Sequence, residues 1–274
     1  MTFLVTGATG TVGRQIVEQL LLKGVPVRAL TRDPARADLP ADVEVVGGDL
    51  AAPDSLAAAF EGVEAAHLIT FGGEAFAPLE TGPELVALAE KAGVRRVTVL
   101  HGGGPSPVED VVRASALDWT VLMPVEFMSN ALEWAEPIRT ADEVREPFVG
   151  RLSAMVHEAD IGAVAAAALT ESGHAGQEYV ITGPDVLTLS GKTEAIAAAR
   201  GRAVRLVELT EDEARGQWRA QGMPESTIDF LVMVYRDTPP EGRTVTDVVQ
   251  RVTGRPARTF GQWATQHAAA FTRA

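Results

Sequence analysis

The sequence of 274 residues contains no cysteine. This absence excludes disulfides, thiolate catalysis and cysteine-based zinc or iron–sulfur sites. No spacing of His, Asp and Glu resembles a metal site either, so we expect no metal. The sequence also has no run of about 18 uncharged apolar residues, the length that spans a bilayer. Residues 1–10 have no basic region and no cleavage signature of a signal peptide. We therefore expect a cytoplasmic protein with no membrane partner.

Positive charge is scarce. There are 24 Lys and Arg against 37 Asp and Glu, which gives a formal net charge of -13. Such a surface repels phosphates over most of its area, so we expect no nucleic-acid partner. The content of 46% hydrophobic and 22% charged residues is typical of a soluble globular protein, and the length allows one or two domains.

Short apolar runs alternate with helical patterns over the first 170 residues or so. Strands are expected at residues 3–5, 25–30, 43–46, 65–70, 95–100 and 119–122. Near-continuous apolar strands that are each followed by a helix indicate a parallel sheet covered on both faces. The predicted fold class is therefore α/β, with a doubly wound parallel sheet of the Rossmann type.

A glycine-rich turn, Gly-Ala-Thr-Gly-Thr-Val-Gly, lies between the first strand and the first helix. Its glycines permit a tight turn, close approach to a pyrophosphate and close packing of strand and helix. The free N–H groups and the dipole of the helix start then attract the anion. An ordinary βα turn can also be rich in glycine, but this position at the start of a βαβ series favours a dinucleotide. The expected contacts are Gly7, Thr9, Gly10, Thr11, Val12 and Gly13.

The end of the second predicted strand indicates which dinucleotide binds. The acidic residue that would hold the ribose hydroxyls of NAD is missing, and Arg32 stands there, with Arg36 four residues later. Guanidinium groups suit a phosphomonoester, so NADP(H) is favoured over NAD(H). The alternatives are a solvated basic pair, or an arginine bridged by Asp33.

From about residue 124 the alternation breaks down. Helices are expected at 160–169, 193–200, 211–219, 226–234 and 260–271, and a strand at 177–182. We therefore divide the chain into an NAD(P)-binding Rossmann domain, residues 1–150, and a smaller, mostly helical substrate domain, residues 151–274. The two are expected to interleave, with the strand at 177–182 returning to the sheet.

Several motifs together resemble a known family. The turn at residues 7–13 is similar to that of the atypical short-chain dehydrogenases/reductases. The stretches at 47–50, 115–124, 160–165 and 177–184 narrow the resemblance to the NmrA-like family, over about residues 1–208. The resemblance implies a Rossmann-type NAD(P)-binding domain, with Asp49 and Leu50 against the adenine. Members include NAD(P)H-dependent reductases of quinones and plant phenolics, and proteins that only sense the cofactor ratio.

The catalytic residues of related enzymes are missing. The typical short-chain dehydrogenase uses a tyrosine whose phenol pKa is lowered by a lysine four residues later. Neither Tyr179 nor Tyr235 is followed by such a lysine. The lysine that the family's phenolic reductases carry before the Asp-Trp-Thr strand is also absent, and Glu109 and Asp110 stand in that region.

His101 ends the fifth predicted strand, where the family resemblance implies a serine near the nicotinamide. Ligands of such sheets lie outside the carboxyl ends of the strands, so a histidine there could act as acid or base. It could equally serve only to hydrogen-bond the backbone of its loop. Thr70 and Phe71, after the fourth strand, complete the expected cofactor contacts together with His101.

Residues after the sixth strand are expected to line the substrate pocket. Met123 replaces an arginine that the family resemblance implies, which makes the pocket more apolar. The other candidates are Glu126, Phe127, Asn130 and Trp134, although the aromatic residues could simply belong to the core.

The sequence thus predicts an NAD(P)H-dependent oxidoreductase of a small apolar carbonyl, quinone or conjugated compound. The alternative is a non-catalytic NADP(H) sensor that binds a protein partner, which the missing catalytic residues would explain. An epimerase-like or lyase activity with a tightly held cofactor is a third alternative. Membership of the family supports fold and cofactor better than it supports a reaction.

Overall fold

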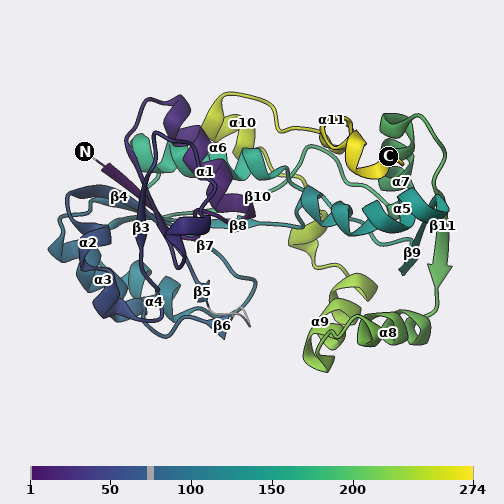
Figure 1. The fold of residues 1–274 in the computed structure, drawn as a ribbon, viewed down its shortest axis with the longest axis horizontal. Helices are drawn as coiled ribbons and strands as arrows, with labels where there is room; N and C mark the ends of the chain where they lie inside the picture. Colours follow the sequence, from purple (N-terminus) through teal and green to yellow (C-terminus); the bar gives the residue numbers. More distant parts are fainter. Residues whose placement is uncertain (1, 73–76, 274) are drawn as a thin grey trace. The chain divides into compact units, whose positions relative to one another are not determined.

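The computed structural model describes residues 2–72 and 77–273. Its main sheet has seven parallel strands in the order β10-β8-β7-β4-β1-β2-β3 (Figure 1). The strands are β1 (Thr2–Val5), β2 (Val27–Thr31), β3 (Glu44–Gly47), β4 (Val63–Ile69), β7 (Arg96–Leu100), β8 (Asp118–Pro124) and β10 (Gln177–Ile181). The strand order reverses at β1, and at such a point an open α/β sheet binds its ligand, outside the carboxyl ends of the strands. The predicted doubly wound sheet is confirmed.

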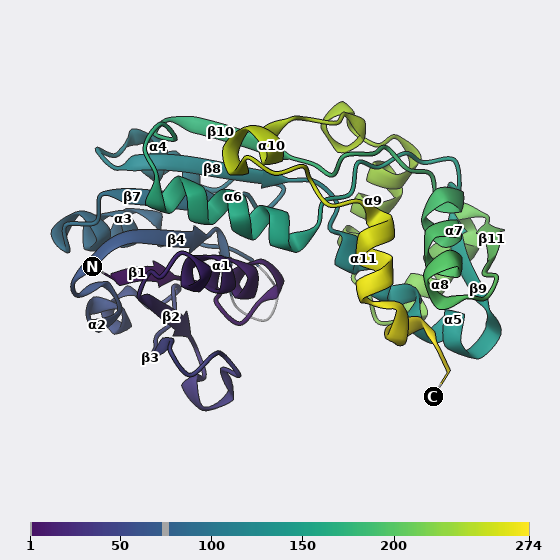
Figure 2. The same cartoon turned by 90° about the horizontal axis from the view of Figure 1, so that it is seen from above.

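Helices cover both faces of this sheet (Figures 1 and 2). On one face, α2 (Ala57–Phe60), α3 (Gly82–Lys91) and α4 (Pro107–Ala114) share a buried apolar cluster with the strands. On the other face, α1 (Thr11–Leu22) packs against α6 (Glu158–Thr170), which also contacts α10 (Val248–Thr253). The contact of α1 with α6 is close, because a Cβ on Gly162 would lie 2.7 Å from the carbonyl carbon of Gln15.

A histidine is buried in the middle of the sheet. His67 of β4 is fully buried, with Nδ1 2.8 Å from the Thr98 hydroxyl oxygen. Its Nε2 has no hydrogen-bond partner among the residues that the structure describes. Burial lowers the pKa of His67 from 6.5 to about 3, because the imidazolium would lose its hydration. The ring is therefore neutral in the folded protein at neutral pH.

We expect His67 to destabilise the protein in acid. Below pH 6.5 the unfolded chain binds a proton at this ring, whereas the folded chain does so only near its lowered pKa, so stability falls as the pH falls. The free energy of unfolding should drop by about 2–3 kcal/mol between pH 6.5 and 4.5 from this group. Urea unfolding at several pH values measures how the free energy of unfolding changes with pH. The same pH dependence in His67→Gln would show that His67 is not its cause.

The chain forms two compact units. The first holds the sheet and contains the residues up to Pro124, Glu158–Ile181 and Val248–Arg255; the second holds Val125–His157, Thr182–Asp247 and the residues from Pro256 onward. The chain thus crosses between the two units several times. The physical reason is burial: α6 and α10 cover one sheet face, and β10 completes the sheet at its edge.

The second unit contains a small parallel sheet that the sequence did not predict, β9 (Glu143–Pro147) with β11 (Arg205–Leu209). Charged residues interrupt both strands, so no apolar run marks them. Its helices are α5 (Ala135–Ala141), α7 (Leu189–Arg200), α8 (Glu211–Ala220), α9 (Glu225–Arg236) and α11 (Phe260–Gln266). The helix expected over 260–271 ends at Gln266 and is followed by a 3₁₀ turn, Ala268–Phe271. Trp263 is fully buried in the core of this unit.

Candidate functional site

The turn between β1 and α1 requires glycine at two positions. Gly7 has φ +60°, a conformation that L side chains rarely adopt. A Cβ on Gly13 would lie 2.1 Å from the carbonyl oxygen of Gly7, so only glycine lets the helix start so close to the turn. These are the two demands of a dinucleotide-binding turn, a tight bend and close packing of helix on strand.

The start of α1 presents free donors to this turn. Gly10 is the N-cap residue and makes no side-chain capping bond, and no acidic residue occupies the first helical turn. Arg14 N–H is the first to bond within the helix, to the Gly10 carbonyl at 3.0 Å, and its Nε donates to the Thr9 carbonyl at 3.0 Å. The N–H groups of Thr11, Val12 and Gly13 therefore have no helical acceptor. This cradle fits the pyrophosphate of a dinucleotide.

Arg32 and Arg36 follow β2 and are both exposed. Asp33 does not bridge either of them: its carboxylate accepts from Ala35 N–H at 3.2 Å and caps the 3₁₀ turn Pro34–Arg36. Across the described ranges neither guanidinium has an ion pair or hydrogen bond. Both cations are thus available to a ligand, although a 3₁₀ turn rather than an α-helix separates them.

The remaining cofactor candidates of the first unit follow the carboxyl ends of β3, β4 and β7. The Asp49 carboxylate accepts from Ala51 N–H at 3.0 Å, and Leu50 beside it is buried. Thr70 is buried and donates its hydroxyl to the Leu100 carbonyl at 3.0 Å, which ties the ends of β4 and β7 together. Phe71 is half-buried and begins the two-residue strand β5 (Phe71–Gly72). Since the strands are parallel, these groups share the sheet edge of the glycine-rich turn.

His101 directly follows β7 at this edge and is held by two hydrogen bonds. Its N–H donates to the Leu122 carbonyl at 2.9 Å, and its Nδ1 lies 2.8 Å from Oε1 of Glu109 on α4. The Glu109 side chain is only 3% exposed, and its other oxygen accepts from Arg113 at 2.9 Å. Arg113 also pairs with Glu178 of β10 at 2.9 Å. Burial by itself would lower the pKa of Arg113, but its contacts with Glu178 and Glu109 raise it overall.

The contact with Glu109 determines what His101 can do chemically. A buried carboxylate accepts a hydrogen bond from Nδ1–H and fixes the orientation of the ring, which leaves Nε2 to face a reactant. The ring is 26% exposed, so a ligand can reach it.

The sequence analysis did not identify Glu109 as a partner of His101. It noted Glu109 only because this residue stands in the region of the lysine that is missing. The signal that was available is its spacing: Ser106 Oγ accepts from Glu109 N–H at 3.3 Å, the N-cap contact that places Glu109 in the first turn of α4.

The second unit contains a buried ionic cluster. Lys192 of α7 is 1% exposed, and its ammonium lies 2.9 Å from a carboxylate oxygen of Glu126. Arg151 pairs with Glu146 at 3.1 Å, and Glu146 also accepts from the indole N–H of Trp134 at 2.8 Å. Sequence reasoning did not single out Lys192 or Arg151, because a lysine in an Ala-rich helix gives no sign of burial.

In this ionic cluster, burial and the neighbouring opposite charges shift the pKa values of Lys192 and Glu126 in opposite directions. Burial lowers the pKa of Lys192 more than Glu126 raises it. Burial alone would raise the pKa of Glu126, but Lys192 and its other polar neighbours, Arg151 among them, lower it overall. Glu133 has no ion pair in the part of the chain that the structure describes, and burial together with Glu146 and Glu126 raises its pKa. Lys192 and Glu126 thus each oppose the shift that burial causes in the pKa of the other.

The expected substrate-pocket residues occupy different environments. Met123 is half-buried at the end of β8 in the first unit. In the second unit, Glu126 and Trp134 belong to the ionic cluster, and Trp134 is largely buried in the core. Phe127 is half-buried and forms a bridge to Val156, whereas Asn130 is exposed. The described residues contain no group of three or more metal-ligating side chains and no helix that is long and apolar enough to cross a membrane.

Comparison with known proteins identifies the class. A family model described as NAD(P)H-binding matches residues 7–107. The chain is 37% identical to the NAD(P)H azoreductase of Xenophilus azovorans, over 98% of both chains. It is 38% identical to the (4-alkanoyl-5-oxo-2,5-dihydrofuran-3-yl)methyl phosphate reductase of Streptomyces griseus, again over 98% of both.

A third relative is quinone oxidoreductase 2 of Escherichia coli, which is 28% identical over 83% of this chain and 84% of its own length. The solved structure of the E. coli NADPH-dependent quinone oxidoreductase QOR2 with NADPH has a TM-score of 0.81 and 23% identity, and covers 96% of this chain and 99% of that one. The fold and the glycine-rich turn define an NAD(P)H-binding Rossmann protein. The chain belongs to the NmrA-like family of atypical short-chain dehydrogenases/reductases.

Proposed function

We propose that this protein is an NADPH-dependent reductase of quinones or of similar conjugated compounds, such as dyes. The observation that carries the proposal is the His101–Glu109 pair, which supplies an oriented proton donor at the sheet edge of the glycine-rich turn. The names of the azoreductase and the quinone oxidoreductase among the relatives support the same class of substrate.

The residues of this chain have separate roles in the proposed reaction. The N–H groups at the start of α1 hold the pyrophosphate, and the contacts of Asp49, Leu50, Thr70 and Phe71 orient the rest of the dinucleotide. When bound, NADPH supplies the hydride. His101 donates the accompanying proton from Nε2 to an oxygen of the acceptor, while Glu109 keeps Nδ1 protonated and stabilises the imidazolium. Reduction of a quinone to its hydroquinone takes up one hydride and one proton, so the atoms and charges balance.

A quinone-like acceptor also accounts for the missing Tyr–Lys pair. The oxyanion that forms on hydride transfer is stabilised by conjugation within the product, so the protein needs no phenol of lowered pKa to stabilise it. We propose that Met123, Glu126, Phe127, Asn130 and Trp134 contribute to acceptor binding.

Stopped-flow measurement of NADPH oxidation tests the function. The panel contains quinones, azo dyes, enones and simple aldehydes, and we expect turnover of the quinones and dyes but not of simple aldehydes. Tight binding of NADPH without oxidation by any acceptor would contradict the proposal and favour the sensor.

We further propose that NADPH is preferred over NADH, and Arg32 provides the test. Arg32→Ala should weaken NADPH binding by about tenfold to a hundredfold, because a charge-assisted contact to the 2′-phosphate contributes about 1.5–3 kcal/mol. NADH affinity should change little. Calorimetry with both cofactors measures the difference, and Arg95→Ala, at the amino end of β7, is the matched control. Equal losses for both cofactors would show that Arg32 does not contact the phosphate.

We place this activity in the cytoplasm, on a small molecule and without a nucleic-acid partner. The net charge of -13 supports the last point, since it repels phosphate backbones.

A further inference from the structure

A pocket of about 300 Å³ opens in the second unit, between residues 148–152 and the segment from the end of α9 to residue 243. Two of its walls pair a guanidinium with an aromatic ring. The guanidinium of Arg151 lies 3.9 Å from the ring centre of Tyr235, and that of Arg236 lies 5.8 Å from the ring centre of Phe148. Leu152 adds an apolar side chain to the lining. The pocket therefore offers both flat apolar surface and cations.

The charge that lines this pocket is mainly positive, in a protein whose net charge is -13. Arg151, Arg236 and Arg243 line it, against the single carboxylate of Asp237. Glu146 and Glu211, which pair with Arg151 and Arg236, are not part of the lining. The third cation, Arg243, is exposed and has neither an ion pair nor a hydrogen bond in the described part of the chain.

One buried donor of a lining residue has no acceptor. The Arg151 side chain is 5% exposed, and its terminal nitrogens bond to the Pro147 carbonyl at 2.8 Å and to Glu146 at 3.1 Å. Its Nε is buried and has no acceptor among the described residues. A buried N–H of a guanidinium without an acceptor is energetically unfavourable, so the protein does not use the full hydrogen-bonding capacity of Arg151.

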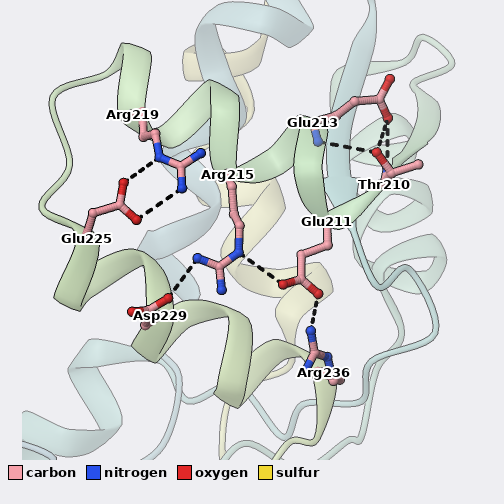
Figure 3. A network of polar contacts seen from close by, with 8 residues as sticks. All are labelled: Thr210, Glu211, Glu213, Arg215, Arg219, Glu225, Asp229 and Arg236. Atoms are coloured by element: carbon pink, nitrogen blue, oxygen red, sulfur yellow. Dashed lines mark hydrogen bonds and ion pairs between the residues drawn. The ribbon is translucent and has the colours of Figure 1, made fainter.

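The walls of the pocket are held in place before any ligand arrives. Figure 3 shows the ion pairs that join α8 to α9: Arg219 with Glu225, Arg215 with Asp229, and Arg236 with Glu211. Glu211 also pairs with Arg215 within α8. Arg236 is therefore fixed at the end of α9. Phe148 has φ +52°, an unfavourable backbone conformation for a residue with a bulky side chain, and such strain is common at ligand sites.

We propose that this pocket binds an aromatic oxyanion, with the ring against the apolar walls and a sulfonate, carboxylate or phosphate on Arg243 and Arg151. Guanidinium groups suit this chemistry because they bind oxyanions with several parallel hydrogen bonds.

Binding to the full chain without NADPH tests the pocket by itself. The probes are naphthalene sulfonate and the uncharged naphthol, measured by calorimetry at low salt. Wild type should bind the sulfonate at least about tenfold more tightly than naphthol. Arg243→Gln should abolish this preference, Arg243→Lys should keep part of it, and Arg95→Gln, an exposed arginine of the first unit, should keep all of it. Equal sulfonate affinity in wild type and Arg243→Gln would overturn the proposal.

Discussion

Replacing His101 by alanine should lower kcat by about 10²–10⁴ and change NADPH affinity little. The reason is that the proton moves only in the transition state, where a positioned acid contributes this much to the rate. Stopped-flow kinetics with one reducible quinone measures kcat, and calorimetry measures NADPH affinity. His174→Ala is the matched control, because this histidine precedes β10 at the opposite edge of the sheet and bonds to Tyr179 at 2.8 Å.

Glu109→Gln tests whether Glu109 only orients the His101 ring or also stabilises its positive charge. The amide keeps a hydrogen bond to the ring but cannot stabilise an imidazolium, so kcat should fall by about tenfold to a hundredfold. If His101 has only a structural role, His101→Ala should change kcat by less than about threefold, which is under ~1 kcal/mol of barrier. That variant would then show a lower melting temperature instead, and the assignment of the proton donor would be wrong.

Lys192→Met should lower the free energy of unfolding by about 3–5 kcal/mol. The substitution removes the cation that lies 2.9 Å from Glu126 and leaves a carboxylate in a largely buried position. An unpaired buried charge costs this much because the interior does not replace its hydration. Urea unfolding measures the loss, and Lys91→Met, at the end of α3 and exposed, should change stability by less than about 0.5 kcal/mol.

The double variant Lys192→Met with Glu126→Leu provides the internal control. Replacement of a buried ion pair by apolar residues of similar volume is often neutral, so most of the lost stability should return. A double variant that is no more stable than Lys192→Met would show that the cost comes from lost packing around α7 rather than from the orphaned carboxylate.

The sequence by itself determined the sheet and the glycine-rich turn. Continuous apolar strands that alternate with helices have few alternatives to a parallel sheet covered on both faces, and the periodicity is local. The turn was equally predictable, because the glycines at 7 and 13 are adjacent in the chain to the strand and helix that require them. The position of Arg32 directly after β2 was predictable for the same reason, because the strand pattern alone sets where β2 ends.

Tertiary structure alone decided which side chains meet. Glu109 lies beside His101 only because the loop after β7 folds α4 back against the strand end. Lys192 and Glu126 are 66 residues apart in the sequence, and the residues that line the pocket come from two segments some 85 positions apart. Local patterns carry no information on such pairs, since burial and ion pairing depend on how distant elements pack. Strands β9 and β11 were missed for the same reason: each is interrupted by charges, and their pairing stabilises them where their own apolar content does not.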